Sequence, residues 1–172
     1  MEIKKILWPT DLSDNAAKAL PLVRSLAQTF GAEVHMLYVA EGIRDYDHTY
    51  GDANPEFLKG FQKMENRRAT GKMDAVCQND LSGCPLITRH LRAGYPPREI
   101  LRLASEIGAG LIVMATMGRD HGQGQGSFFG SVSERVVRYS ALPVLLVNPA
   151  GQGYYPELAP QTPRGHEEEG KA

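Results

Sequence analysis

Short apolar runs alternate with segments of helical periodicity along most of the chain. The apolar runs predict five strands, which cover residues 3–8, 33–39, 86–91, 111–115 and 144–147. Between them, apolar residues recur at spacings of three and four and predict helices near residues 13–31, 54–76, 97–107 and 132–139. This alternation predicts an α/β fold, in which an open five-stranded parallel sheet has helices on both faces.

Two prolines interrupt this pattern. Pro9 follows the first apolar run, and because proline lacks a backbone donor we expect it to end that strand. Pro21 falls inside the first helical segment, where a proline costs about 3 kcal/mol. That segment therefore contains either a kinked helix capped by Ser13 or Asp14, or a helix that begins near Pro21.

A glycine-rich stretch links the fourth predicted strand to the last predicted helix. It follows the run LIVMATMG and reads RDHGQGQGSFFGS, with glycines at positions 118, 122, 124, 126 and 130. Glycines let backbone N–H groups approach an anion closely, and the first N–H groups of a helix carry the positive end of its dipole. Strand, glycine-rich loop and helix start together predict a phosphate-binding site.

A second polar segment follows the first predicted strand, at the same edge of the expected sheet. Ligands of open parallel sheets lie beyond the carboxyl ends of the strands, where the strand order switches. Asp11 lies at such an end and can accept a hydrogen bond from a base or a ribose, while the loop from Gly118 to Ser131 holds phosphates. Alternatively, Asp11 only starts a turn before Ser13.

Composition narrows the possible functions. The chain has 172 residues, enough for one domain with its own core, and its net charge of −1 gives no reason to expect nucleic acid as a partner. No apolar run reaches the length of a membrane span, and the apolar patch near the N-terminus is too short for a signal peptide. We therefore expect a cytoplasmic protein that binds neither nucleic acid nor membrane.

Two cysteines and one polar loop raise the question of redox or metal chemistry. Cys77 and Cys84 have no histidine pattern beside them, so we expect two reduced, unrelated thiols, with a redox pair as the alternative. A loop is expected over residues 41–51, and its Asp45, Asp47 and His48 are more typical of turns than of ligands. The sequence therefore predicts no metal site.

Two further groups of polar residues fit an ordinary surface. The helix expected from residue 54 carries a basic patch without interleaved aromatics, which is typical of a solvated face; the patch comprises Lys63, Arg67, Arg68 and Lys72. His35, in the second predicted strand, either faces solvent or is half-buried with a hydrogen-bond partner.

Three segments resemble the universal stress protein family. They are ILWPTDLSDNAAKAL, IVMATMG and FGSVSERVVRYSALPVLLV, and they follow the family's order and spacing over residues 1–148. The resemblance implies a Rossmann-like fold of the adenine nucleotide alpha hydrolase type, commonly a homodimer, in which many members bind ATP and others bind none. The remaining residues, 149–172, are rich in Gly, Pro and Glu and are expected to form a tail.

The nucleotide-binding signature of that family is present with two departures. The family has a glycine, two residues, a second glycine, nine residues, and then glycine with serine or threonine. Here Ala115 replaces the first glycine, Gly118 matches the second, and eleven residues precede Gly130 and Ser131. Alanine is a small change where φ is negative and a disabling one where φ is positive.

The resemblance also implies which residues contact a nucleotide. Asp11 and Val39 meet the adenine and ribose, and the residues around Gly118 and Gly130 surround the phosphates. As alternatives, Arg119 is only an exposed loop charge and Ser131 only a helix N-cap, while His121 is an additional candidate donor. The full candidate set is Pro9, Thr10, Asp11, Val39, Ala115, Met117, Gly118, Arg119, Gly130, Ser131, Val132 and Ser133.

The resemblance and the residues leave three alternative functions. The first is a dimeric stress-response regulator that binds ATP, with or without Mg²⁺, or a related adenine nucleotide, and that pairs through the edge strand Pro143–Val147. The second is a nucleotide-free interaction protein of the same fold. The third is a slow ATP hydrolase or self-phosphorylating protein with Ser131 or Ser133 as acceptor. No Walker Gly-Lys-Ser/Thr, catalytic triad or paired carboxylates are found, so we expect binding without catalysis.

Overall fold

Five parallel strands form one sheet, as the sequence predicted. The computed structural model describes residues 2–40, 55–81, 84, 86–118 and 129–149. Its strands are β1 (Lys5–Pro9), β2 (Glu33–Ala40), β3 (Ile87–Ala93), β4 (Leu111–Ala115) and β5 (Val144–Val147). They lie in the order β3-β2-β1-β4-β5, and every neighbouring pair is parallel. The chain therefore leaves β1 in one direction across the sheet and later returns to β1's other side through β4.

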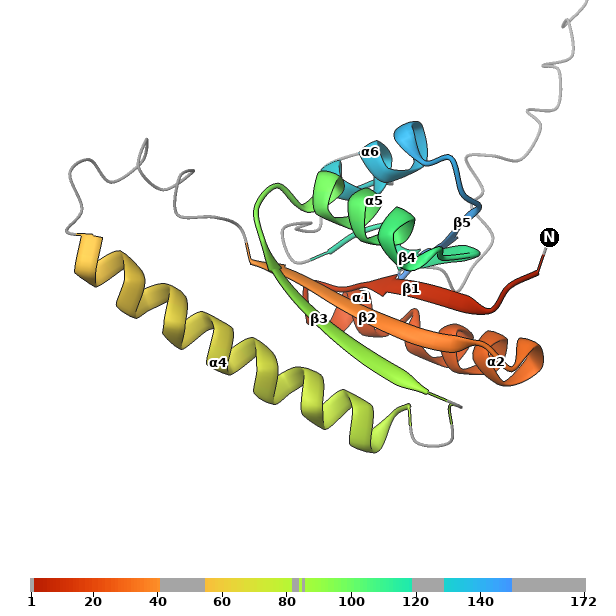
Figure 1. The fold of residues 1–172 in the computed structure, drawn as a ribbon, viewed down its shortest axis with the longest axis horizontal. Coiled ribbons are helices and arrows are strands. Elements are labelled where there is room, and N and C mark those ends of the chain that lie inside the picture. The colour runs from red at the N-terminus through yellow and green to blue at the C-terminus, as the bar shows by residue number, and fades with distance from the viewer. Residues whose placement is uncertain (1, 41–54, 82–83, 85, 119–128, 150–172) are drawn as a thin grey trace, which may run out of the picture.

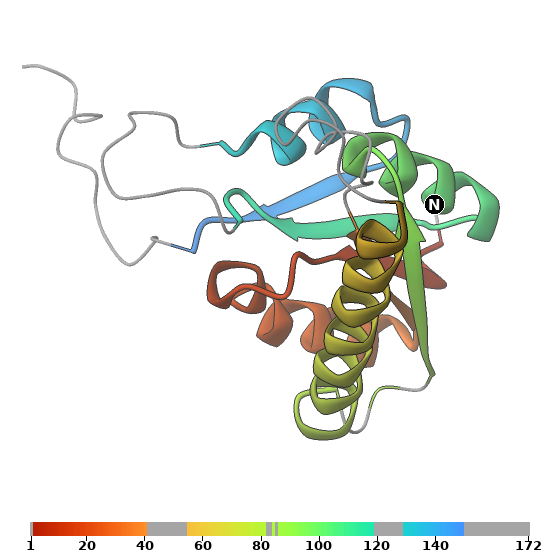
Figure 2. The same ribbon diagram turned by 90° about the vertical axis from the view of Figure 1, so that its left-hand side faces the viewer.

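Helices cover both faces of this sheet (Figures 1 and 2). The helices α1 (Asp14–Ala17), α2 (Leu20–Phe30) and α4 (Pro55–Asn79) lie on one face. On the other face lie α5 (Pro96–Ile107) and α6 (Ser131–Tyr139). Each face buries its own apolar cluster, centred on Trp8, Val34 and Met36 under α2 and on Leu7, Leu37 and Ile112 under α5 and α6. Burial of this apolar area is the main force that holds the layers together.

The helical segment after β1 is divided in two. Ser13 caps α1, because its hydroxyl oxygen accepts a 3.2 Å hydrogen bond from the Ala16 N–H. A separate helix, α2, begins at Leu20, so Pro21 lies in its first turn, where the N–H has no helical partner to lose. Of the two predicted arrangements, the helix that begins near Pro21 is therefore the correct one.

Element ends differ slightly from the predicted bounds. β1 ends at Pro9 as expected, whereas α4 continues three residues beyond residue 76 and β3 continues two residues beyond Leu91. The basic patch on α4 is exposed, in agreement with a solvated face. Among the described residues, no helix has the length and apolar character needed to cross a bilayer.

The two cysteines are free thiols that pack against the cluster under α2. Burial raises the pKa of both, and for Cys84 the charge of Arg24 opposes this effect. Asp45, Asp47, His48 and the predicted tail from residue 150 onwards lie outside the described residues.

Candidate functional site

A cavity of about 170 Å³ lies at the carboxyl ends of β1 and β4. These two strands are neighbours at the point where the strand order switches, which is the usual ligand position in open parallel sheets. Eleven of the twelve candidate residues line this cavity, and the twelfth, Arg119, lies outside the described residues, as does His121. The structure therefore brings together segments more than one hundred residues apart in the sequence.

Six lining residues were not predicted. They are Ala16, Leu37, Pro96, Ile100, Met114 and Thr116. Leu37, Ile100 and Met114 are buried apolar side chains, and together with Val39 they give the cavity a largely hydrophobic wall. A wall of this kind, with few polar groups, is typical of sites for planar organic ligands.

The turn between β1 and α1 forms one side of the cavity. The Leu12 N–H donates a 3.0 Å hydrogen bond to Thr10 Oγ1, and the backbone and hydroxyl of Ser13 donate to Asp11 Oδ1 at 3.0 and 2.6 Å. Leu12 has a φ of 60°, a left-handed conformation that costs a bulky residue free energy. Asp11 therefore both starts the turn and lines the cavity, so its two alternative interpretations are compatible.

Gly118 lies directly against this turn. A Cβ atom at position 118 would be 2.5 Å from Asp11 Oδ2, which is closer than real Cβ atoms approach non-bonded heavy atoms. The Asn15 side chain also donates a 3.1 Å hydrogen bond to the Gly118 carbonyl. Glycine is required here by space, since Gly118 is not among the described glycines with positive φ.

Ala115 is compatible with the fold. It is the last residue of β4 and pairs in register with Val147 of β5. Among the described non-glycine residues, Leu12 has a positive φ and Ala115 does not. The backbone at Ala115 therefore corresponds to the case of negative φ, in which alanine in place of the family's first glycine is a small change.

The start of α6 forms the third side of the cavity. Gly130 is its N-cap and Ser131 its first residue, so the interpretation of Ser131 as the N-cap is wrong. Glu134 donates the first intrahelical hydrogen bond, to the Gly130 carbonyl at 3.0 Å. The N–H groups of Ser131, Val132 and Ser133 therefore have no acceptor within the helix, and they lie at the positive end of its dipole.

Thr116 connects this helix start to the sheet. Its carbonyl accepts hydrogen bonds from the Gly130 N–H at 2.7 Å and the Ser133 hydroxyl at 2.6 Å. Its own N–H donates to the Val147 carbonyl at 2.8 Å. The Thr116 hydroxyl oxygen is buried and has no hydrogen-bond partner within the described part of the chain. The peptide groups of Thr116 thus hold α6, β4 and β5 together.

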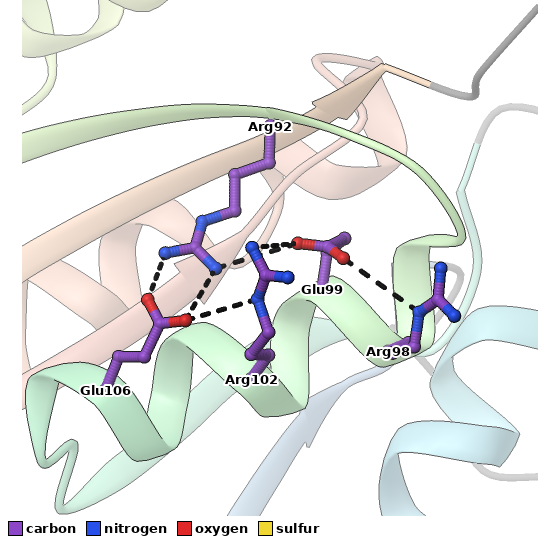
Figure 3. A network of polar contacts seen from close by, with 5 residues as sticks. All are labelled: Arg92, Arg98, Glu99, Arg102 and Glu106. Atoms are coloured by element: carbon purple, nitrogen blue, oxygen red, sulfur yellow. Dashed lines mark hydrogen bonds and ion pairs between the residues drawn. The ribbon is translucent and has the colours of Figure 1, made fainter.

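A charged network fixes α5, whose Pro96 and Ile100 line the cavity (Figure 3). Glu99 is only 4% exposed and lies 3.6 Å from Arg92 of β3 and 3.3 Å from Arg102. Arg92 also pairs with Glu106 near the end of α5, and this hydrogen bond raises the pKa of Arg92 and lowers that of Glu106. The network therefore anchors α5 to the edge strand β3 at both ends of the helix.

Comparison with known proteins identifies the family. The universal stress protein family model matches residues 2–148. The chain belongs to the universal stress protein family. Universal stress protein MJ0531 of Methanocaldococcus jannaschii is 32% identical over 144 residues, which are 84% of this chain and 81% of that protein.

Solved universal stress proteins share the fold. The structure of MJ0577 from Methanocaldococcus jannaschii is 28% identical with a TM-score of 0.72, covering 86% of this chain and 97% of that one. A universal stress protein from Archaeoglobus fulgidus in complex with dAMP is 20% identical with a TM-score of 0.56, covering 84% and 96% of the two chains. The predicted five-stranded, Rossmann-like α/β fold of the family is thereby confirmed.

Among the described residues of this universal stress protein, β5 is an edge strand of the sheet. That strand is last in the sheet order and pairs with β4 on one side. Leu145 is 37% exposed, and Val137 and Tyr139 of the neighbouring α6 are 46% and 68% exposed.

Within the described ranges, no group of three or more potential metal-ligating side chains is found.

Proposed function

We propose that this universal stress protein binds an adenine nucleotide, with ATP as the expected ligand, in the cavity at the ends of β1 and β4. The observation that carries this proposal is that the hydrophobic wall and the helix-start N–H groups of α6 border the same cavity. A nucleotide base packs against a hydrophobic wall, and its phosphates accept hydrogen bonds from N–H groups at a helix start. The dAMP complex of the Archaeoglobus fulgidus protein, which has the same fold, supports the ligand class.

In the proposed complex, each side of the cavity meets a different part of the nucleotide. The base packs against Leu37 and Val39, and Asp11 accepts hydrogen bonds from the base or ribose. The N–H groups at Ser131 to Ser133 donate to phosphate oxygens, and Arg119 supplies a cation to them. A cavity of about 170 Å³ accommodates the base and leaves the phosphates at its rim.

We further propose that nucleotide occupancy regulates association of two copies through β5. Thr116 contacts both the helix start that would hold phosphate and the last residue of β5, so the two regions are joined by consecutive hydrogen bonds. An exposed edge strand offers unpaired backbone groups to a second copy. The protein would then act in the cytoplasm as a dimeric, non-enzymatic stress-response regulator, formed by residues 1–148 with a C-terminal tail.

Calorimetric titration with ATP, with and without Mg²⁺, tests the binding. Protein checked by mass spectrometry for co-purified nucleotide should bind ATP, and Gly118→Val should abolish binding because its side chain displaces Asp11. Gly71→Val is the matched control, since a Cβ atom at this exposed position on α4 meets nothing within 4 Å. Absence of both co-purified and titratable nucleotide would overturn the proposal and favour a nucleotide-free interaction protein.

Sedimentation velocity tests the association separately. Leu145→Glu should convert the dimer to a monomer because it places charge on the β5 edge. Leu91→Glu is the control, since Leu91 is similarly exposed, at 41%, on the opposite edge strand β3. A wild-type protein that sediments as a monomer with and without ATP would contradict this part of the proposal.

A further inference from the structure

Two histidines from neighbouring strands meet under α5. His35 of β2 is 6% exposed, and its Nδ1 lies 2.9 Å from Nε2 of His90 on β3. The ring planes differ by 17° and the ring centroids are 5.2 Å apart. Because the centroid separation exceeds the nitrogen separation by about the width of one imidazole ring, the rings meet edge to edge, with nitrogen facing nitrogen. The contact is therefore a hydrogen bond between two imidazoles.

Glu33 determines which nitrogen carries the proton. Its carboxylate oxygen lies 3.4 Å from His35 Nε2, and a carboxylate can only accept a hydrogen bond. His35 Nε2 therefore carries a hydrogen, which leaves His35 Nδ1 as an acceptor for the His90 Nε2–H. The result is a continuous chain of hydrogen bonds from His90 through His35 to Glu33, which joins the edge strand β3 to β2.

We propose that Glu33, His35 and His90 form a pH-sensitive junction that holds β3 on the sheet and opens when both imidazoles are protonated. One added proton can be accommodated, because a singly charged pair still has one donor and one acceptor at the facing nitrogens. A second proton places two N–H groups and two positive charges against each other at 2.9 Å. The two rings must then move apart, and we expect the edge strand β3, which carries His90, to loosen from β2 with them.

The surrounding charges favour this response. Arg92 of β3 and Glu106 of α5 act on His90, and Lys5 of β1 is paired in register with Glu33. Burial lowers the pKa of His90, the charges of His35 and Arg92 lower it further, and Glu106 opposes them. His90 is therefore harder to protonate in the folded protein than in the unfolded chain, where it has the usual histidine pKa of about 6.5. Stability is full above that value and falls as the pH drops through it towards the lower folded pKa.

Opening of this junction would reach the rest of the molecule through the same two strands. β2 continues from His35 to Leu37 and Val39 at the cavity, and β3 continues from His90 to Arg92 in the network that anchors α5. The proposal does not depend on nucleotide binding, because the histidines lie outside the cavity lining. It gives this chain a response to acidification that is built into its sheet.

The test is an NMR titration of the full-length protein from about pH 8 to about pH 5, where histidines change charge. The His90 ring signals should titrate below the usual histidine range, and the His35 ring signals should respond in the same steps because the two rings share a hydrogen bond. Amide exchange over residues 88–91, corrected for its intrinsic pH dependence, should reveal an opening equilibrium that rises up to about tenfold per pH unit for each proton taken up. Independent titrations with unchanged protection of β3 would overturn the proposal.

Variants separate the junction from general acid sensitivity. His35→Gln and His90→Gln should each reduce the pH dependence of the opening equilibrium. The double variant should reduce it no further, because the two rings act as a pair. Folding of each variant is checked by circular dichroism at about pH 8, above the usual histidine pKa of about 6.5. Arg89→Gln is the control: it changes β3 on the opposite face, where Arg89 pairs with Asp74, and should leave the acid response intact. Additive effects of the two histidine variants would contradict a shared junction.

Discussion

The hydroxyl of Ser133 donates a 2.6 Å hydrogen bond to the Thr116 carbonyl, across a sequence separation of 17 residues. Ser133 is 2% exposed, so this bond is shielded from water. The residue was expected to surround a phosphate, and its side chain also has a structural role, because it holds the first turn of α6 against the end of β4. The position of the N–H groups at the start of α6 therefore depends on this bond.

Removal of that hydroxyl is expected to affect stability and binding together. Ser133→Ala should lower the free energy of unfolding by about 1 kcal/mol, the usual net contribution of one hydrogen bond, and should weaken ATP binding. Urea unfolding and calorimetry measure the two effects. Ser131→Ala is the control for stability, because Ser131 is exposed and makes no capping bond, so its change should stay within about 0.5 kcal/mol. Equal stability losses in both variants would contradict the assigned role of Ser133.

Gly118→Ala is expected to destabilise the protein through Asp11. The new Cβ would meet Asp11 Oδ2, and Asp11 cannot easily move because Ser13 holds its other oxygen with two hydrogen bonds. We expect a loss of about 1–3 kcal/mol, which is typical of overpacking. A double-mutant cycle in urea with Asp11→Ala checks the cause, since removal of the carboxylate should recover part of the loss. Strictly additive effects would show that the clash lies elsewhere.

Two glycine-to-alanine substitutions should have opposite signs. Gly94 has a φ of 138°, and an added Cβ would contact Glu99 at 3.4 Å, so Gly94→Ala should cost about 1–3 kcal/mol. Gly71 lies in the exposed interior of α4 with open space around it, so Gly71→Ala should stabilise by about 0.5–1 kcal/mol. Thermal or urea unfolding of both variants measures this difference. A stabilising Gly94→Ala would contradict the left-handed backbone at that position.

Cys77 and Cys84 should react slowly with thiol reagents in the folded state. Burial raises the pKa of both thiols, so the reactive thiolate is scarcer at neutral pH than in free cysteine. The reaction rate with a chromogenic disulfide should therefore rise with pH over a range above the usual cysteine value, and unfolding in urea should remove the delay. Rapid reaction of the native protein at neutral pH would be inconsistent with this burial.

The architecture could be predicted because both periodicities in this sequence are strong. Five short apolar runs give the strands, and the glycine-rich segment after β4 together with Asp11 gives two sides of the cavity. The predictions fail where long-range contacts decide the outcome. β3 continues to Ala93 because Arg92 and Ala93 pair in register with Val39 and Ala40 of β2, and no local pattern in the sequence indicates that pairing.

The hydrophobic wall and the histidine pair show the same limit. Pro96 and Ile100 reach the cavity only because α5 packs across β1 and β2. This packing cannot be predicted from a single sequence. Likewise, His35 lies in a mostly apolar strand and His90 in a strand with several polar residues, and neither has a nearby sequence signal for the other. Alternating polar residues in two predicted neighbouring strands were the available clue, and they become informative once the strand order is known.

The conformation of Leu12 restricts which residues can replace it in related sequences. Its backbone is left-handed, while its side chain packs against the core under α2, so the position needs both a tolerant backbone and an apolar contact. β-Branched residues meet the second demand and are penalised most by the first. As relatives diverge, valine and isoleucine should be avoided at this position, and asparagine or glycine should appear where a larger neighbour fills the core. A lineage with isoleucine there would be expected to have rebuilt the whole turn that carries Asp11.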